Sequence, residues 1–208
     1  LLSAFTREGR YGGSFENRTR FLLDIVEKIK DRLGDSMEVA VRLNVYDAIP
    51  APYGWGTDRE DFHVPDLSEP KRLAGMLWER GVRLLNVTCG NPYYNPHVNR
   101  PYDRGFYTPP EHPLAGAERI LRCGKEIQEV VPEMTVIGTG LSWMREYGAL
   151  VAAGAVGSGW FKLAGFGRQA FAYPDFPLDI FEKGGMKRSK CCISCSKCSE
   201  IMRFGGRT

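Results

Sequence analysis

Three cysteines near the end of the sequence have a spacing that suits metal or cluster chemistry. Cys192, Cys195 and Cys198 follow one another at intervals of three residues. A loop with this spacing can direct three thiolates at one inorganic cluster, as in bacterial iron–sulfur proteins. Zinc is one alternative, although structural zinc sites usually pair two such units and a single unit is present here. Thiols that bind no metal are another, and Cys191 is not expected to be a ligand.

Two glycine-containing turns offer a place for a phosphate group. Residues 138–140 (GTG) and 165–168 (GFGR) each follow a strand-like segment and lead into a helix-like one. At the carboxyl ends of neighbouring parallel strands, glycines let backbone N–H groups approach an anion, and an arginine adds a positive fork. Ordinary tight turns between strand and helix are the alternative. The predicted phosphate site consists of Thr139, Gly140, Gly167 and Arg168.

Arg42 lies in a strand-like run at residues 37–43 that is otherwise apolar from Val39 onward. Alternation places its side chain either inside a barrel or beneath a helix, where a buried guanidinium needs an anionic or carbonyl partner. The pyrimidine edge of a flavin, which gains negative charge on reduction, is such a partner, and a structural ion pair is the alternative. We therefore expect Arg42 to be buried.

His97 is the histidine expected in a loop at the end of a strand. The loop, residues 91–100 (NPYYNPHVNR), also carries Tyr93 and Tyr94. An imidazole can relay a proton near neutral pH, which makes His97 the candidate catalytic residue. The alternative is a loop histidine packed between the tyrosines, which themselves could stack on a ring or form a pocket wall.

Strand-like and helix-like segments alternate along most of the chain. Helical patterns cover residues 14–33, 68–81, 115–131, 142–153 and 169–182, and strand-like runs cover residues 37–43, 84–87, 134–137 and 160–163. This order predicts an α/β fold with parallel strands, either doubly wound or part of a (β/α)8 barrel. A whole barrel needs eight strands. We therefore expect half a barrel in residues 1–183, which needs a complement for its open edges, and a cysteine-rich segment in residues 184–208.

Composition narrows the functional classes. The 208 residues are 43% hydrophobic and 25% charged, with a net charge of +3 and dispersed basic residues. A nucleic-acid-binding surface is therefore not expected, and no apolar run is long enough to span a membrane. Four of the six cysteines crowd into eight residues, which favours metal binding in the reducing cytoplasm over disulfide pairing.

Residues 11–21 (YGGSFENRTRF) resemble the Y-G-G-S-x-E-N-R-x-R-F signature of the old yellow enzyme family, whose members are FMN-dependent NADH:flavin oxidoreductases. Residues 1–5 (LLSAF) resemble the end of that family's fourth barrel strand. Residues 167–176 (GRQAFAYPDF) resemble the stretch after its eighth strand, with Tyr173 in place of an acidic residue. The cysteine segment resembles the iron–sulfur branch, which includes 2,4-dienoyl-CoA reductase and trimethylamine dehydrogenase. The resemblance implies strands five to eight of a TIM barrel, followed by the start of an iron–sulfur segment.

The same resemblance implies cofactors and a reaction. FMN would lie across the top of the barrel, with Arg42 at its N1/O2 edge and the predicted phosphate site at its other end. A [4Fe–4S] cluster would be held by Cys192, Cys195 and Cys198 and by a fourth cysteine past Thr208. Hydride would pass between reduced flavin and an activated alkene such as an enoyl thioester or enone. Electrons would come from NAD(P)H through the cluster, with FAD and NAD(P)H bound in further C-terminal domains.

Other interpretations remain open at this point. The reaction could instead be oxidation of a small amine, as by trimethylamine dehydrogenase, and the chain could be a non-catalytic half barrel that binds metal or phosphate. The expected partners are a small-molecule substrate, the first half of the barrel and the C-terminal domains of the same protein. His97 loosely resembles a histidine that works with the proton donor of 2,4-dienoyl-CoA reductase. The family's proton-donating tyrosine would precede Leu1, so we expect these 208 residues alone to reduce no enone.

Overall fold

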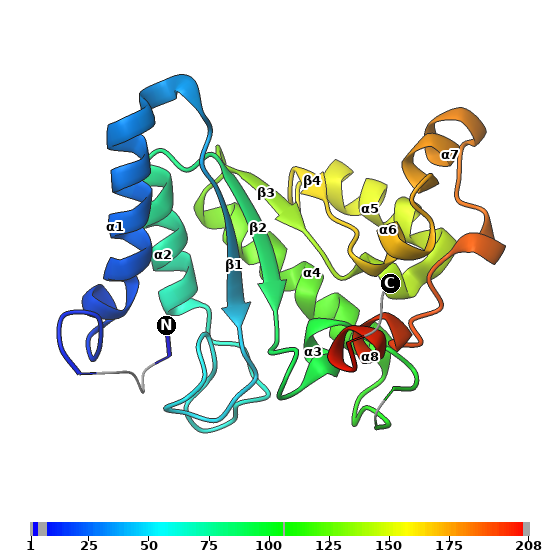
Figure 1. Cartoon of the computed structure of the whole chain (residues 1–208), viewed down its shortest axis with the longest axis horizontal. Coiled ribbons are helices and arrows are strands. Elements are labelled where there is room, and N and C mark those ends of the chain that lie inside the picture. The colour runs from blue at the N-terminus through cyan, green and yellow to red at the C-terminus, as the bar shows by residue number, and fades with distance from the viewer. Residues whose placement is uncertain (1, 4–7, 106, 206–208) are drawn as a thin grey trace.

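The computed structural model has four parallel strands at its centre and describes residues 2–3, 8–105 and 107–205 (Figure 1). The strands are β1 (Ala40–Tyr46), β2 (Leu84–Cys89), β3 (Thr135–Gly138) and β4 (Leu163–Ala164). They are hydrogen-bonded in the order β1-β2-β3-β4, which is also their order in the sequence. Each connection carries helices, as the alternating pattern predicts.

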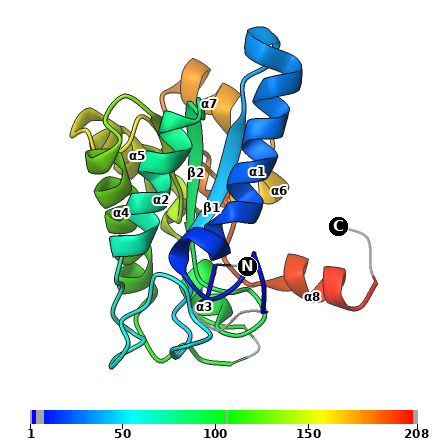
Figure 2. The ribbon, with the colours of Figure 1, turned by 90° about the vertical axis from the view of Figure 1, so that its left-hand side faces the viewer.

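The helices that connect the strands lie on one face of the sheet. They are α2 (Ser68–Glu79), α4 (Pro113–Val130) and α5 (Gly148–Gly157), with α1 (Phe15–Leu33) beside α2. Figure 2 shows α8 (Lys197–Arg203) on the opposite side of the sheet from α2, α4 and α5. A doubly wound sheet reverses its strand order and carries helices on both faces, whereas an unreversed order with helices on one face is the arrangement of a (β/α)8 barrel. Of the two predicted architectures, the barrel type therefore fits.

Alternation along the strands sorts side chains between the two faces of the sheet. Val41, Leu43 and Val45 of β1 and Leu85 and Val87 of β2 are buried in the core that contains the apolar faces of α2 and α4. The residues between them are exposed or half-buried and include Arg42, Asn44, Asn86 and Thr88. We call this second side the open face. Arg42 is exposed there, so the expectation that it is buried within the chain is wrong.

The YGGSFENRTRF motif forms the start of α1 and joins it to α2. The Ser14 hydroxyl caps the helix by accepting the Asn17 N–H at 3.3 Å. Arg18 is buried; its Nε donates to the Gly13 carbonyl at 3.0 Å and its two terminal nitrogens reach the Glu69 carboxylate at 2.6 and 3.0 Å. Arg18 of the motif therefore has a structural role, because it links α1 to Glu69 of α2. The LLSAF resemblance at residues 1–5 falls largely outside the described residues.

Most predicted elements are shifted by a few residues at their ends, and three differ more strongly from the structure. The helix expected over residues 142–153 is a 3-10 segment, η2 (Leu141–Tyr147), followed by α5, because Arg145 adopts a left-handed φ of 51°. The strand expected over residues 160–163 is the shorter β4, because Phe161 turns into the core against Gly138. The last helix is divided into α6 (Arg168–Ala172) and α7 (Phe176–Lys183), with Pro177 in the first turn of α7.

The remaining elements are short. They are η1 (Gly34–Ser36), α3 (Pro96–Asn99) and η3 (Arg188–Lys190). Within the described ranges, β1 pairs with β2 alone and β4 with β3 alone, so both edges of the sheet are open. No helix in the described part of the chain combines the length and the apolar character needed to cross a bilayer.

Candidate functional site

A cavity of about 660 Å³ lies on the open face at the carboxyl ends of the strands. Its lining brings together all five residues predicted to bind FMN and one of the three predicted cluster ligands. These six residues are Arg42, Thr139, Gly140, Gly167, Arg168 and Cys198. They come from β1, the two glycine turns, the start of α6 and α8. We call this space the arginine cavity.

The arginine cavity is cationic. Arg42, Arg100 and Arg168 line it, and no aspartate or glutamate is among its described lining residues. The Nη2 of Arg168 donates to the Pro101 carbonyl at 3.0 Å, whereas its Nη1 is buried and has no hydrogen-bond partner within the described chain. Burial lowers the pKa of Arg168 below its ordinary value. Since an unpaired buried cation is costly, an anion in the cavity would satisfy this nitrogen.

Neutral polar groups and glycines form the rest of the cavity near the sheet. Asn86 lies opposite Arg42 in the β1–β2 register, and the Thr139 hydroxyl donates to the Val87 carbonyl at 2.8 Å. Gly140 has a φ of +94°, which favours glycine. A Cβ added at Gly167 would meet no atom of the described chain within 4 Å. The space beside Gly167 is therefore open to a ligand that approaches the backbone.

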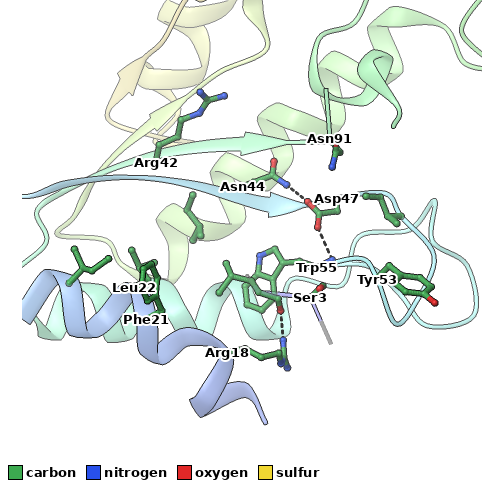
Figure 3. A pocket seen from close by; sticks show the side chains of 14 residues that line it. Ser3, Arg18, Phe21, Leu22, Arg42, Asn44, Asp47, Tyr53, Trp55 and Asn91 are labelled. Atoms are coloured by element: carbon green, nitrogen blue, oxygen red, sulfur yellow. Dashed lines mark hydrogen bonds between the residues drawn. The ribbon is translucent and has the colours of Figure 1, made fainter. Parts of the chain in front are cut away.

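A second cavity of about 500 Å³ shares Arg42 with the first (Figure 3). It lies between α1, the end of β1 and the following loop, and Tyr53 and Trp55 are part of its wall. The Asp47 carboxylate holds the loop by accepting the Trp55 N–H at 3.0 Å and a hydrogen bond from Asn44. Burial raises the pKa of Asp47. We call this space the aromatic cavity.

His97 lies apart from the five predicted flavin residues. It is in α3, is half-buried, and lines neither the arginine cavity nor the aromatic cavity. Its Nδ1 is 2.6 Å from the Tyr107 hydroxyl, and its Nε2 is 4.0 Å from the Glu111 carboxylate. Burial lowers the pKa of His97, so its neutral form is favoured near pH 7.

Of the three cysteines of the predicted cluster, Cys192 and Cys195 lie on a loop that packs against α6, and Cys198 lies in the first turn of α8. The Cys192 N–H donates to the Gln169 Oε1 at 3.0 Å, and the Ser194 N–H points at the Cys192 sulfur at 3.4 Å. Ser194 and Ser196 have left-handed φ values of 55° and 61°, which curl the loop. Among the described residues, no three His, Cys, Asp or Glu side chains are arranged as a metal site.

Sequence comparison with known proteins finds relatives that are flavin oxidoreductases by their family description. Residues 4–62 match the model of the NADH:flavin oxidoreductase / NADH oxidase family. An NADH oxidase from Thermoanaerobacter brockii is 29% identical over 203 residues, which cover 97% of this chain and 26% of the relative. A cinnamate reductase from Clostridium sporogenes is 27% identical over 193 residues, which cover 92% and 26%. Over most of its length the chain is therefore similar to proteins of the NADH:flavin oxidoreductase / NADH oxidase family.

Solved structures show the fold of this family for the present chain. An old yellow enzyme homologue from Zymomonas mobilis superposes with a TM-score of 0.56 at 23% identity, over 89% of this chain and 42% of that one. The 6-hydroxypseudooxynicotine amine oxidase HisD from Pseudomonas geniculata N1 gives 0.65 at 22% identity, over 97% and 26%. The chain spans about a quarter of the length of the NADH oxidase and of the cinnamate reductase that it matches.

The structure adds residues to the candidate site that sequence reasoning did not single out. Asn86, Asn99 and Arg100 line the arginine cavity, and the buried Gln169 joins it to the cysteine loop. Period-two alternation in the run at 84–89 could have revealed Asn86 as a neighbour of Arg42. No sequence signal indicated Gln169, because its role depends on a loop that returns from more than twenty residues away.

Proposed function

We propose that the protein binds FMN in the arginine cavity and transfers hydride between reduced flavin and an activated alkene, such as an enone or an enoyl thioester. The observation that carries this proposal is the cavity's charge: three arginines, no carboxylate among the described lining residues, and a buried Arg168 nitrogen without a partner. A volume of about 660 Å³ lies within the range of roughly 300–1,000 Å³ typical of cofactor pockets.

The residues fit the two ends of FMN differently. Arg168 is the group for the phosphate, together with the Thr139–Gly140 turn and the open space beside Gly167. Arg42 is the group for the pyrimidine edge, where its positive charge would stabilise the negative charge of the reduced ring. Bound FMN supplies the hydride donor and acceptor, and the chain supplies binding, orientation and electrostatics. Phe166, Phe171 and Met202 form an apolar wall that can exclude water.

The aromatic cavity is the proposed place for a flat organic substrate, because it shares Arg42 with the arginine cavity. Its wall contains Tyr53 and Trp55, whose rings suit an apolar or conjugated substrate. His97 stays the proposed catalytic residue as a proton relay that does not contact the substrate, because it lines neither cavity, and Tyr107 is its hydrogen-bond partner. Its neutral imidazole carries one N–H for donation.

A [4Fe–4S] cluster is the proposed electron carrier, held by Cys192, Cys195 and Cys198 and by a ligand outside the described residues. The curled loop, the N–H directed at the Cys192 sulfur, and the buried hydroxyls of Ser194 and Ser196 support this part of the proposal. These hydroxyls have no hydrogen-bond partner within the described chain, and the sulfurs of a cluster accept such hydrogen bonds. NAD(P)H is the proposed electron source, and an FAD and the domains for both would belong to the further length that the relatives have.

Cofactor analysis tests this function directly. The full-length protein, purified without oxygen, is expected to release FMN on denaturation, to contain iron and acid-labile sulfide, and to oxidise NADH or NADPH in the presence of cinnamate or cyclohexenone, whereas these 208 residues alone are expected to reduce no enone. A colourless protein that contains zinc would overturn the proposal and favour the non-catalytic half barrel.

Amine oxidation is the second candidate, because the HisD amine oxidase superposes on 97% of this chain with a TM-score of 0.65. The two reactions run the flavin in opposite directions. An alkene reductase reoxidises reduced flavin when the alkene is added, whereas an amine dehydrogenase bleaches oxidised flavin when the amine is added. Anaerobic mixing of the protein with each substrate class therefore distinguishes them by the flavin absorbance.

A further inference from the structure

Trp55 has a buried hydrogen-bond donor without a partner in the wall of the aromatic cavity. The residue is 3% exposed and lines that cavity. Its indole Nε1 is buried and has no hydrogen-bond partner in the described part of the chain. An indole nitrogen can only donate, and a buried tryptophan N–H usually has an acceptor. In Figure 3 this nitrogen lies on the side of the ring away from Arg18, toward β1 and the middle of the lining residues. The donor therefore faces the space that a ligand would fill.

The backbone on both sides of Trp55 is fixed by close packing. A Cβ added at Gly54 would lie 2.1 Å from a backbone carbonyl oxygen, and one added at Gly56 would lie 1.8 Å from another. Only glycine allows the chain to come this close. The Trp55 N–H also donates to the Asp47 carboxylate at 3.0 Å, and the Asp47 N–H donates to the Trp55 carbonyl at 2.9 Å. The position of Trp55 is thus set before any ligand binds.

The ring of Trp55 packs against side chains of α1. The Phe15 ring stacks on it, with the two centroids 6.4 Å apart and the planes at 11°. The guanidinium carbon of Arg18 lies 5.9 Å from the indole centroid, and Arg18 is itself held by Glu69. These contacts fix the direction of the N–H and leave the nitrogen edge of the ring for a ligand.

The other polar groups of the aromatic cavity also favour a ligand that accepts hydrogen bonds. Asp47 is the one carboxylate among the described lining residues, and its two oxygens already accept hydrogen bonds from Asn44 and from the Trp55 backbone. The Oδ1 of Asn91 accepts two backbone N–H groups, so its amino group is turned away from them. With Arg42, the wall presents more donors than acceptors.

We infer that Trp55 determines which substrates the aromatic cavity accepts, a step that rests on the proposed function. Its Nε1–H donates a hydrogen bond to the carbonyl or carboxylate oxygen that is conjugated to the alkene. Negative charge moves onto that oxygen as hydride is added to the alkene, so the hydrogen bond is stronger in the transition state than in the ground state. An ammonium substrate would bring further donors to a wall of donors. The favoured substrates are therefore planar alkenes that carry a conjugated oxygen acceptor.

The test removes the indole N–H and keeps the shape of the ring. In the full-length protein, Trp55 is replaced by 3-benzothienylalanine, in which sulfur takes the place of the N–H. The same replacement at Trp143 is the matched control, because the Trp143 Nε1 donates to Asp103 at 3.0 Å and its side chain lines neither cavity. Flavin absorbance of the oxidised protein gives the Kd of trans-cinnamaldehyde and of trans-β-methylstyrene. The two ligands share one carbon skeleton, and only the aldehyde carries an oxygen.

Loss of the N–H at Trp55 should raise the Kd of the aldehyde roughly 3- to 10-fold and leave that of the hydrocarbon unchanged. The Trp143 replacement should change neither. Equal changes for both ligands at Trp55, or none, would overturn the inference alone.

A crystal structure with cinnamaldehyde gives a readout that needs no variant. The aldehyde oxygen is expected within hydrogen-bonding distance of the Trp55 Nε1, and an aldehyde oxygen bound by another group would overturn the inference. A full-length protein that binds no FMN, or neither ligand, would overturn the proposed function and the inference with it.

Discussion

Arg168 donates one hydrogen bond to the Pro101 carbonyl through Nη2, whereas its buried Nη1 has no hydrogen-bond partner in the described part of the chain. The Nη2 to carbonyl distance is 3.0 Å, and the unpaired Nη1 belongs to a side chain that lines the arginine cavity. The contact with Pro101 fixes the guanidinium before any ligand arrives. A pre-positioned cation loses little conformational entropy when an anion binds, which favours tight phosphate recognition.

Replacing Arg168 should weaken FMN much more than riboflavin, because riboflavin lacks the phosphate. A hydrogen bond to a charged group contributes about 1.5–3 kcal/mol, so Arg168→Gln should raise the Kd for FMN roughly 10- to 150-fold. Fluorescence titration of the flavin-depleted protein with both flavins measures this. Arg122→Gln is the matched control, since Arg122 is exposed and pairs with Glu118 one turn away. An equal loss for both flavins in Arg168→Gln would place the phosphate elsewhere.

Replacing Arg42 should change the flavin's reduction potential. Its charge is expected to stabilise the anionic reduced ring, so Arg42→Gln should lower the potential while the ratio of FMN to riboflavin affinity stays the same. If the reduced ring loses about 1.4 kcal/mol of electrostatic stabilisation, the potential of a two-electron couple falls by roughly 30 mV. Dye-equilibrated reduction under anaerobic conditions gives the value. An unchanged potential would mean that the pyrimidine edge faces another group.

An added methyl group should lower stability at Gly138 and weaken FMN binding at Gly167. Gly138→Ala places a Cβ 2.3 Å from the Phe161 ring, and such overpacking typically costs about 1–3 kcal/mol of stability. Gly167→Ala meets no atom of the described chain within 4 Å, so it should leave the melting temperature unchanged and weaken FMN by crowding its phosphate. Thermal unfolding with and without FMN separates the two effects. Normal FMN affinity in Gly167→Ala would show that no ligand comes close to this backbone.

The half-buried His97 should make the free energy of unfolding depend on pH. Burial lowers the pKa of His97 below its ordinary value of 6.5. Between the two pKa values the unfolded chain binds the proton and the folded chain does not, so stability falls as the pH drops below about 6.5. Chemical unfolding at pH 5.5 and 7.5 should show a smaller difference for His97→Gln than for the unaltered protein. The exposed His63 provides the control His63→Gln, and an unchanged difference in His97→Gln would contradict the account.

The alternation of strands and helices and the positions of the glycine turns could be predicted from sequence, because both depend on local patterns. The predicted burial of Arg42 was wrong, because periodicity says that a side chain faces away from the helices but not what covers that face. The predicted bounds of β4, residues 160–163, differ from the observed ones because its register is set by Ile137 and Gly138 of the neighbouring strand. The break before Gly148 depends on the left-handed conformation of Arg145, which no residue type at that position announces.

Site residues could be predicted from the sequence where the residue type itself indicates the chemistry. They could not be predicted where their role depends on contacts that only the folded chain makes. Arg168 stood out as a cation in a glycine turn, yet nothing in the sequence showed that one of its nitrogens lacks a partner. Gln169 was not predicted to belong to the site, although its Oε1 accepts a hydrogen bond from the Cys192 N–H. The distance of His97 from both cavities likewise depends on the path of the loop after β2 and on its contact with Tyr107.

A crystal structure of the protein with FMN tests the central claim most directly. The account predicts the phosphate within hydrogen-bonding distance of the Arg168 Nη1, beside Gly167, and the pyrimidine edge of the ring facing Arg42. Electron density for FMN outside the arginine cavity, or with the phosphate at Arg42 and the ring at Arg168, would contradict it.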